Sequence, residues 1–149
     1  MYRRILMPLD GSERAEAILP HVEDLAQHYD AVLILLRVVR LVLPGGSEFE
    51  RDAIVAARAF EEQLTQARTY LRKLEKRLRA QGITAEIRVA RGGAVEEILR
   101  VAKEENVDLI AMASHGWSGL ARVFYGSVTA GVLHRVDRPL LLVRSREEP

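Results

Sequence analysis

The sequence contains no cysteine, which excludes disulfide bonds, thiolate metal sites and cysteine-based catalysis. Aromatic residues make up only 5% of the chain, too few for a platform on which the bases of single-stranded nucleic acid could stack. Neither charge sign dominates, because 22 lysines and arginines stand against 21 aspartates and glutamates, for a formal net charge of +1. A nucleic-acid-binding groove needs a clear basic excess, so we expect no nucleic-acid partner.

Long hydrophobic runs are also missing. The apolar run near the start, residues 5–7, is too short for a secretory signal. The longest apolar stretch, residues 31–43, contains Arg37 and Arg40 and is shorter than the roughly 20 residues of a membrane-spanning helix. The sequence therefore predicts a cytoplasmic protein with no membrane partner.

What is present is a chain of 149 residues, of which 48% are hydrophobic, and this predicts a single domain over residues 1–149 with a full core. Apolar segments of strand length alternate with helical patterns. The predicted strands are residues 5–7, 32–36, 84–90, 109–113 and 140–143. The order β-α-β-α-β-α-β-α-β implies parallel strands joined by right-handed crossovers. The predicted fold class is α/β, an open, doubly wound, five-stranded parallel sheet with helices on both faces.

Two of the helical segments carry further signals. Residues 15–26 present one apolar face, with Asp10 or Ser12 as the cap and Pro20 inside the helix, where it should remove a hydrogen bond and cause a bend. Residues 60–78 place apolar side chains at a 4-3-4-3-4 spacing. That spacing fits either a coiled-coil seam or one amphipathic helix packed on the sheet, and the shortage of clean heptads favours the amphipathic helix.

A doubly wound sheet binds ligands at the carboxyl ends of its strands, near the point where the strand order reverses. Suitable chemistry follows the first strand in residues 8–12 and the fourth strand in residues 114–127. Gly116 and Gly126 in the second segment let a ligand approach the backbone closely. Gly126, Ser127 and Val128 open the last helix, whose N–H groups and positive dipole end together favour an anion. Ser127 is placed either to cap this helix or to form a hydrogen bond with a phosphate oxygen.

Several common nucleotide-binding motifs are absent. The chain has no Gly-x4-Gly-Lys-Ser/Thr motif, which excludes a P-loop NTPase, and no Gly-x-Gly-x-x-Gly after the first strand, which argues against a dinucleotide enzyme. A receiver domain carries an acidic cluster after the first strand, and related adenylyltransferases carry His-x-Gly-His. This chain has Asp10, Gly11 and Ser12 there.

The segment after the fourth strand resembles the universal stress protein family, in its ATP-binding branch. That branch carries Gly-x2-Gly-x9-Gly-Ser/Thr, and here Ala113 stands at the first glycine, followed by Gly116, nine further residues and Gly126-Ser127. The opening residues 5–12 and the closing residues 138–143 match the family as well, so the resemblance covers essentially the whole chain. It implies a Rossmann-like fold of the adenine nucleotide alpha-hydrolase type.

By this resemblance the protein binds ATP, with Mg²⁺ or Mn²⁺ carried on the phosphates. Asp10 would hold the ribose hydroxyls, and its alternative role is that of a helix cap. The other implied contacts are Pro8, Leu9 and Val38 around the adenine, Met112 beside the nucleotide, and Ala113, His115, Gly116, Gly126, Ser127 and Val128 at or near the phosphates.

The resemblance implies a stress-response or regulatory module that binds ATP, rather than an enzyme with rapid turnover. One alternative is a slow ATPase or phosphotransferase that uses His115. Another is a nucleotide-free dimeric scaffold of the family's other branch, for which Ala113 is the sequence support. The resemblance also implies a homodimer through the last strand, residues 140–143, and an apolar edge strand there would favour pairing with a second copy. It further implies a downstream protein partner.

Overall fold

The computed structural model describes residues 1–41, 49–115 and 126–145. Its centre is a five-stranded parallel sheet in the order β3-β2-β1-β4-β5. The strands are β1 (Arg4–Pro8), β2 (Val32–Val39), β3 (Ala85–Arg91), β4 (Leu109–His115) and β5 (Leu140–Ser145). This arrangement confirms the predicted doubly wound α/β fold, and the strand order reverses between β1 and β4.

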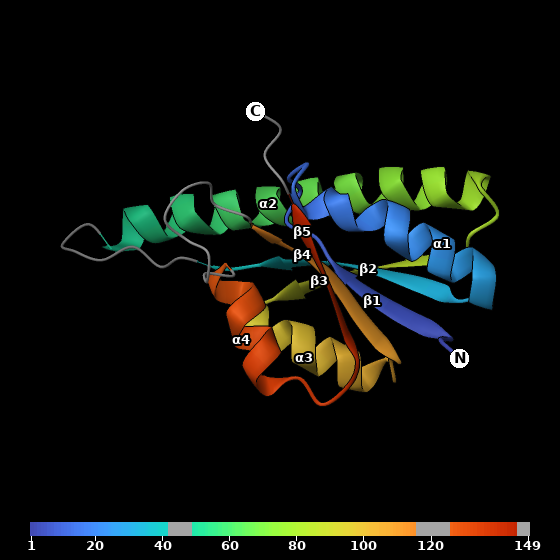
Figure 1. Ribbon diagram of the computed structural model, residues 1–149. Coiled ribbons are helices and arrows are strands. Elements are labelled where there is room, and N and C mark those ends of the chain that lie inside the picture. Colours follow the sequence, from blue (N-terminus) through green and yellow to red (C-terminus); the bar gives the residue numbers. More distant parts are fainter. Residues whose placement is uncertain (42–48, 116–125, 146–149) are drawn as a thin grey trace.

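Helices cover both faces of the sheet (Figure 1). One layer holds η1 (Ala15–Ile18), α1 (Leu19–Tyr29) and α2 (Phe49–Ala80), and the other holds α3 (Ala94–Glu104) and α4 (Ser127–Arg135). Strand β1 contributes side chains to the core on each face of the sheet. Ile5 and Met7 pack with residues of α1 and α2, whereas Leu6 packs with residues of α3 and α4. All three side chains are fully buried, as expected of a parallel sheet that is covered on both sides.

The first helical segment differs from the prediction at Pro20. The predicted bend in a helix interior is wrong, because the segment begins as the 3₁₀-helix η1 and becomes α-helical at Leu19, which places Pro20 in the first turn of α1. The N–H groups of a first turn have no partner within the helix, so a proline there gives up no hydrogen bond. The Ser12 hydroxyl accepts the Ala15 N–H at the start of η1 at 3.2 Å and donates to Asp10 Oδ1 at 2.5 Å, whereas the N-cap position of η1 is held by Arg14.

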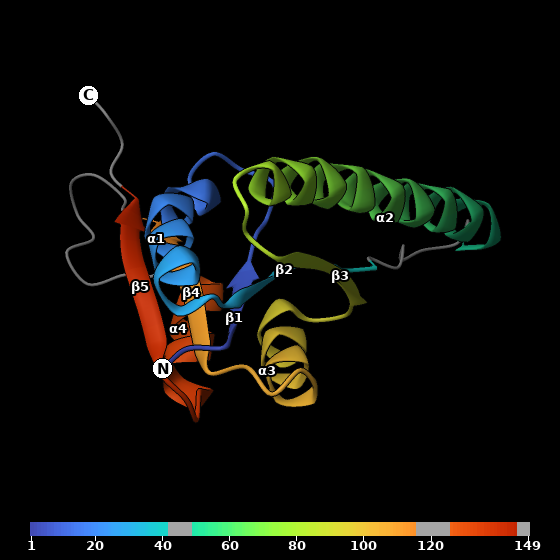
Figure 2. The same ribbon diagram turned by 90° about the vertical axis from the view of Figure 1, so that its right-hand side faces the viewer.

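Helix α2 is a single amphipathic helix of 32 residues packed on the sheet, as the shortage of clean heptads predicts. Its buried side chains are Leu64, Ala67, Leu71, Leu74 and Leu78. The amino-terminal part of α2 runs out beyond the β3 edge of the sheet (Figure 2). Within the described ranges, none of the helices combines the length and the apolar character that crossing a membrane requires.

Strands β1 and β4 pair only at their amino-terminal ends. The register between them stops at Leu6↔Ile110, although both strands continue. Leu9 donates its N–H to the Leu36 carbonyl of β2 at 2.8 Å. Since alternate residues of a strand direct their N–H groups to opposite neighbours, the nitrogen of Pro8 faces β4. Proline has no N–H, so the next hydrogen bond between these strands cannot form and the strands part.

At their amino-terminal ends, β1 and β4 are joined through the Asp108 carboxylate. Asp108 Oδ2 accepts the N–H groups of Arg3 at 2.7 Å and Arg4 at 2.9 Å, and the Asp108 N–H donates to the Arg4 carbonyl at 2.9 Å. The Arg3 N–H, helped by the Arg4 N–H, stabilises the charged form and lowers the pKa of Asp108. Asp108 therefore holds the start of β1 against the start of β4.

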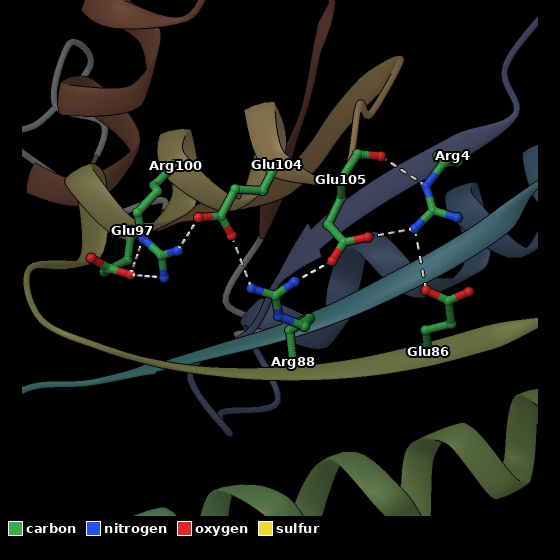
Figure 3. Close-up of polar contacts among 7 residues, drawn as sticks. All are labelled: Arg4, Glu86, Arg88, Glu97, Arg100, Glu104 and Glu105. Carbon is green, nitrogen blue, oxygen red and sulfur yellow. Dashed lines mark hydrogen bonds and ion pairs between the residues drawn. The ribbon is translucent and has the colours of Figure 1, made fainter.

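An ion-pair network fastens the carboxyl end of α3 to the sheet (Figure 3). It consists of Arg4, Glu86, Arg88, Glu97, Arg100, Glu104 and Glu105. Glu105 is its centre, because its carboxylate contacts Arg4 of β1 at 2.7 Å and also pairs with Arg88 of β3, while its carbonyl accepts Arg4 Nε at 2.8 Å. The side chain of Glu105 is only 21% exposed, so its bonds are better shielded from water than those of a surface pair.

We expect Asp108→Asn to lower the free energy of unfolding by about 1 kcal/mol at neutral pH, because an amide oxygen accepts two N–H groups more weakly than a carboxylate. The pKa of Asp108 is lowered in the folded state, so its contribution is present above the unfolded-state pKa and disappears as pH falls through the folded-state pKa. Urea unfolding between neutral and strongly acidic pH should therefore show parent and variant converging in acid. Asp24→Asn, on the exposed side of α1, is the control, and a gap that persists in strong acid would contradict this role.

We expect Glu105→Gln to lower the free energy of unfolding by about 1–2 kcal/mol, because Arg4 and Arg88 lose their shared counter-charge. Added salt should narrow the gap between parent and variant, since it screens the ion pairs of the parent. Denaturant unfolding at low and high salt measures both effects. Glu62→Gln, at an exposed α2 position with no ion pair in the described part of the chain, is the matched control, and equal losses for the two variants would rule the network out.

Candidate functional site

A cavity of about 210 Å³ lies where β1 and β4 part, at the carboxyl end of the sheet. The ends of β1, β2 and β4 form its walls together with the beginnings of α3 and α4. The residues that line it are Pro8, Leu9, Asp10, Ala15, Leu36, Arg37, Val38, Ala94, Ile98, Met112, Ala113, Gly126, Ser127, Val128 and Thr129. The cavity thus occupies the crevice at which the strand order reverses, where open α/β sheets bind their ligands.

Nine of the eleven residues named from the sequence lie around this cavity. They are Pro8, Leu9, Asp10, Val38, Met112, Ala113, Gly126, Ser127 and Val128. His115 is the last residue of β4, but its side chain and the whole of Gly116 lie outside the described residues. The fold therefore brings together residues from four separate parts of the sequence around one cavity.

Six lining residues were not predicted, namely Ala15, Leu36, Arg37, Ala94, Ile98 and Thr129. Leu36 and Arg37 come directly before Val38 at the end of β2, and the rule that ligands bind at strand ends could have found them if applied to this strand. Ala94 and Ile98 have no such signal, because their place in the wall depends on how α3 packs against the sheet.

The inner part of the cavity is apolar. Leu36 and Ile98 are buried, Met112 is 5% exposed, and Val38 packs against the same cluster. All four belong to the core between the sheet and the α3–α4 layer. Walls of this kind fit a flat apolar group such as a heterocyclic ring.

Asp10 stands at the exposed rim of the cavity, directly after β1. Its Oδ1 atom accepts the Ser12 N–H at 2.8 Å and the Ser12 hydroxyl at 2.5 Å. Gly11 between them has φ +85°, a conformation that other residues rarely adopt. This turn fixes the direction of the Asp10 carboxylate, which can accept hydrogen bonds from ligand hydroxyls.

The beginning of α4 supplies the polar end of the cavity. Gly126 is the N-cap residue with ψ 154°, and no side chain among the described residues caps the helix. The Ala130 N–H donates to the Gly126 carbonyl at 2.9 Å, so the N–H groups of residues 127–129 precede the hydrogen bonds within the helix. Together with the exposed Ser127 hydroxyl, these N–H groups can hold an anionic group.

Arg37 adds a positive charge to the wall. Its Nε atom is buried, and the described residues offer it no hydrogen-bond partner. A buried donor without an acceptor is unfavourable, so a ligand acceptor that reached Nε would be bound favourably. Burial, and after it the Glu16 carboxylate, raises the pKa of the neighbouring Tyr70. The Tyr70 phenol is therefore neutral at physiological pH and supplies no negative charge to Arg37.

In the part of the chain that the structure describes, no three histidine, aspartate or glutamate side chains gather in a way that could hold a metal ion. The apolar wall, the rim carboxylate and the amide groups of α4 together fit a ligand with a flat apolar head, hydroxyl groups and an anionic tail.

Comparison with known proteins gives consistent matches along the chain. The sequence matches the universal stress protein family over residues 1–144. It is 30% identical to universal stress protein MJ0577 of Methanocaldococcus jannaschii, over 98% of this chain and 97% of that protein. The solved structure of MJ0577 superposes with a TM-score of 0.83, covering 99% of each chain.

Two further solved structures contain nucleotides. A universal stress protein in complex with cAMP is 24% identical, with a TM-score of 0.67 over 97% of this chain and 98% of that one. A family protein from Arabidopsis thaliana with AMP bound is 16% identical, with a TM-score of 0.65 over 97% of this chain and 92% of that one. At these identities the likeness shows the shared fold alone.

Proposed function

The chain belongs to the universal stress protein family, and we propose on that premise that it is a cytoplasmic regulatory module whose cavity binds ATP. One observation carries the proposal: nine residues that the family resemblance implies as nucleotide contacts lie around a cavity at the reversal point of the sheet. The cAMP and AMP complexes of proteins with the same fold support an adenine nucleotide as the class of ligand.

In this proposal the adenine lies in the apolar part of the cavity, between Val38 and Met112. The ribose hydroxyls donate to the Asp10 carboxylate at the rim. The phosphates accept hydrogen bonds from the N–H groups at the start of α4 and from the Ser127 hydroxyl, and Mg²⁺ or Mn²⁺ is held by the phosphates and water.

Simple energetics indicate that the phosphate contacts alone do not suffice. Three charge-assisted hydrogen bonds contribute roughly 5–9 kcal/mol before the cost of immobilising the ligand is subtracted. Micromolar affinity corresponds to about −8 kcal/mol, so the adenine and ribose contacts are needed as well. Ala113, in the place of the first motif glycine, lines the cavity without closing it, which supports retention of nucleotide binding.

Isothermal titration calorimetry with ATP and Mg²⁺ tests this function. We expect the parent to bind in the micromolar range and Gly126→Val to lose at least roughly thirtyfold in affinity, because the new side chain intrudes where the phosphates lie. Leu133→Ala changes an exposed side chain of the same helix and is the control that keeps its affinity. A parent that shows no binding at millimolar ATP, and no nucleotide in a mass spectrum of the denatured protein, would favour the nucleotide-free scaffold instead.

We further propose that the protein forms a homodimer through β5, an edge strand whose apolar residues 140–143 are only partly buried. The Ile110 N–H bonds to the Pro139 carbonyl, so by alternation the N–H of Leu142 points away from β4. Leu142→Pro should therefore remove an outward donor and weaken pairing between copies, while the bonds to β4 remain.

Light scattering at micromolar concentration should give twice the chain mass of 16.8 kDa for the parent and a shift toward that mass for Leu142→Pro. Circular dichroism of the variant confirms that the sheet is retained. A parent that scatters as a monomer would contradict the dimer.

A further inference from the structure

Gly131 lies in the middle of α4, at the contact with α3. Glycine is disfavoured in a helix interior, so its presence inside a helix of nine residues points to a packing reason. A Cβ atom at Gly131 would lie 2.6 Å from Cγ2 of Val95, 3.3 Å from its Cγ1 and 3.5 Å from its Cβ. The backbone of α4 thus approaches Val95 more closely than any residue with a side chain would allow.

Val95 cannot turn aside to make room. A β-branched side chain in a helix is confined to one strongly preferred rotamer, and both of its methyl groups are close to Gly131. Val95 also packs against the core between the sheet and the α3–α4 layer. Ordinary contact begins at about 3.4 Å, so a methyl group at position 131 would push the two helices apart by up to about 0.8 Å.

Such a shift would reach the cavity, because both helices line it. Helix α3 contributes Ala94, the neighbour of Val95, and α4 contributes Ser127 and Val128, which lie one turn before Gly131 on the same side of the helix. Figure 1 shows α4 lying alongside α3 on one face of the sheet. Good N–H···O distances span only about 0.5 Å, so a displacement of this size takes donors at the start of α4 out of range.

We propose that Gly131 is a positioning residue for the phosphate end of the cavity. By letting α4 lie directly against Val95, it sets where the N–H groups of residues 127–129 stand relative to the strand ends. This inference rests on the proposed nucleotide-binding function and adds to it a residue outside the sequence motif.

Four proteins test the proposal: the parent, Gly131→Ala, Val95→Ala and the double variant. Gly131→Ala should weaken ATP binding at least roughly tenfold and leave the affinity for adenosine within about twofold, because adenosine has no phosphate to contact α4. Val95→Ala removes both methyl groups that the new Cβ would meet. The double variant should therefore recover ATP affinity to within about threefold of Val95→Ala alone.

Calorimetry with ATP and with adenosine gives these affinities, and circular dichroism confirms that the variants fold, as expected for a substitution that favours helix. If the parent binds ATP and Gly131→Ala binds it equally well, the positioning role is overturned. Equal losses for ATP and adenosine, or a double variant that does not recover, overturn it too. A parent that binds neither ligand overturns the proposed function itself, so the two failures are told apart by the parent alone.

Discussion

The hydrogen bond that β1 cannot make to β4 is the constraint on which the rest of the molecule depends. Asp108 holds the two strands together at their amino-terminal ends through the N–H groups of Arg3 and Arg4. Pro8 has no N–H to offer β4, and the register stops before it. The strands therefore part in one direction only, toward the end where the chain leaves the sheet for its loops. The cavity lies between the separated carboxyl ends of β1 and β4, while the pairing of their amino-terminal ends keeps the sheet continuous.

The walls of the cavity are held by the same forces that hold the fold. Leu36, Met112 and Ile98 line the cavity and also belong to the buried cluster under α3 and α4, so they are in place before any ligand arrives. The other end of α3 is fixed by charge, since Glu105 joins Arg4 of β1 to Arg88 of β3. Apolar packing at one end of the helix and ion pairs at the other leave little ordering for a ligand to impose, which favours affinity.

Apolar runs and the alternation of strands with helices predicted the strands and the reversal point, because buried parallel strands are continuous apolar runs. The nine predicted residues that line the cavity were implied by the family resemblance. Sequence reasoning failed where the outcome depends on tertiary packing. Pro20 fits a helix interior by periodicity but marks a first turn once η1 precedes it. Ala94 and Ile98 become wall residues only through the placement of α3, and the contact between Gly131 and Val95 requires two helices that no local pattern joins.

Arginine side chains outside the cavity and the anion-binding end of the cavity use different chemistry. Arg138, for example, donates through Nη1 to the carbonyls of Ala102 at 2.7 Å and Val107 at 3.1 Å, and thereby ties the start of β5 to the end of α3. Of the lining residues that the structure describes, Arg37 is the arginine, and the anion-binding end offers the Ser127 hydroxyl, backbone N–H groups and the dipole of α4. Fixed amide dipoles bind phosphate without adding formal charge. A chain with a net charge of +1 can therefore use arginines to stabilise its fold and still present a site for an anion.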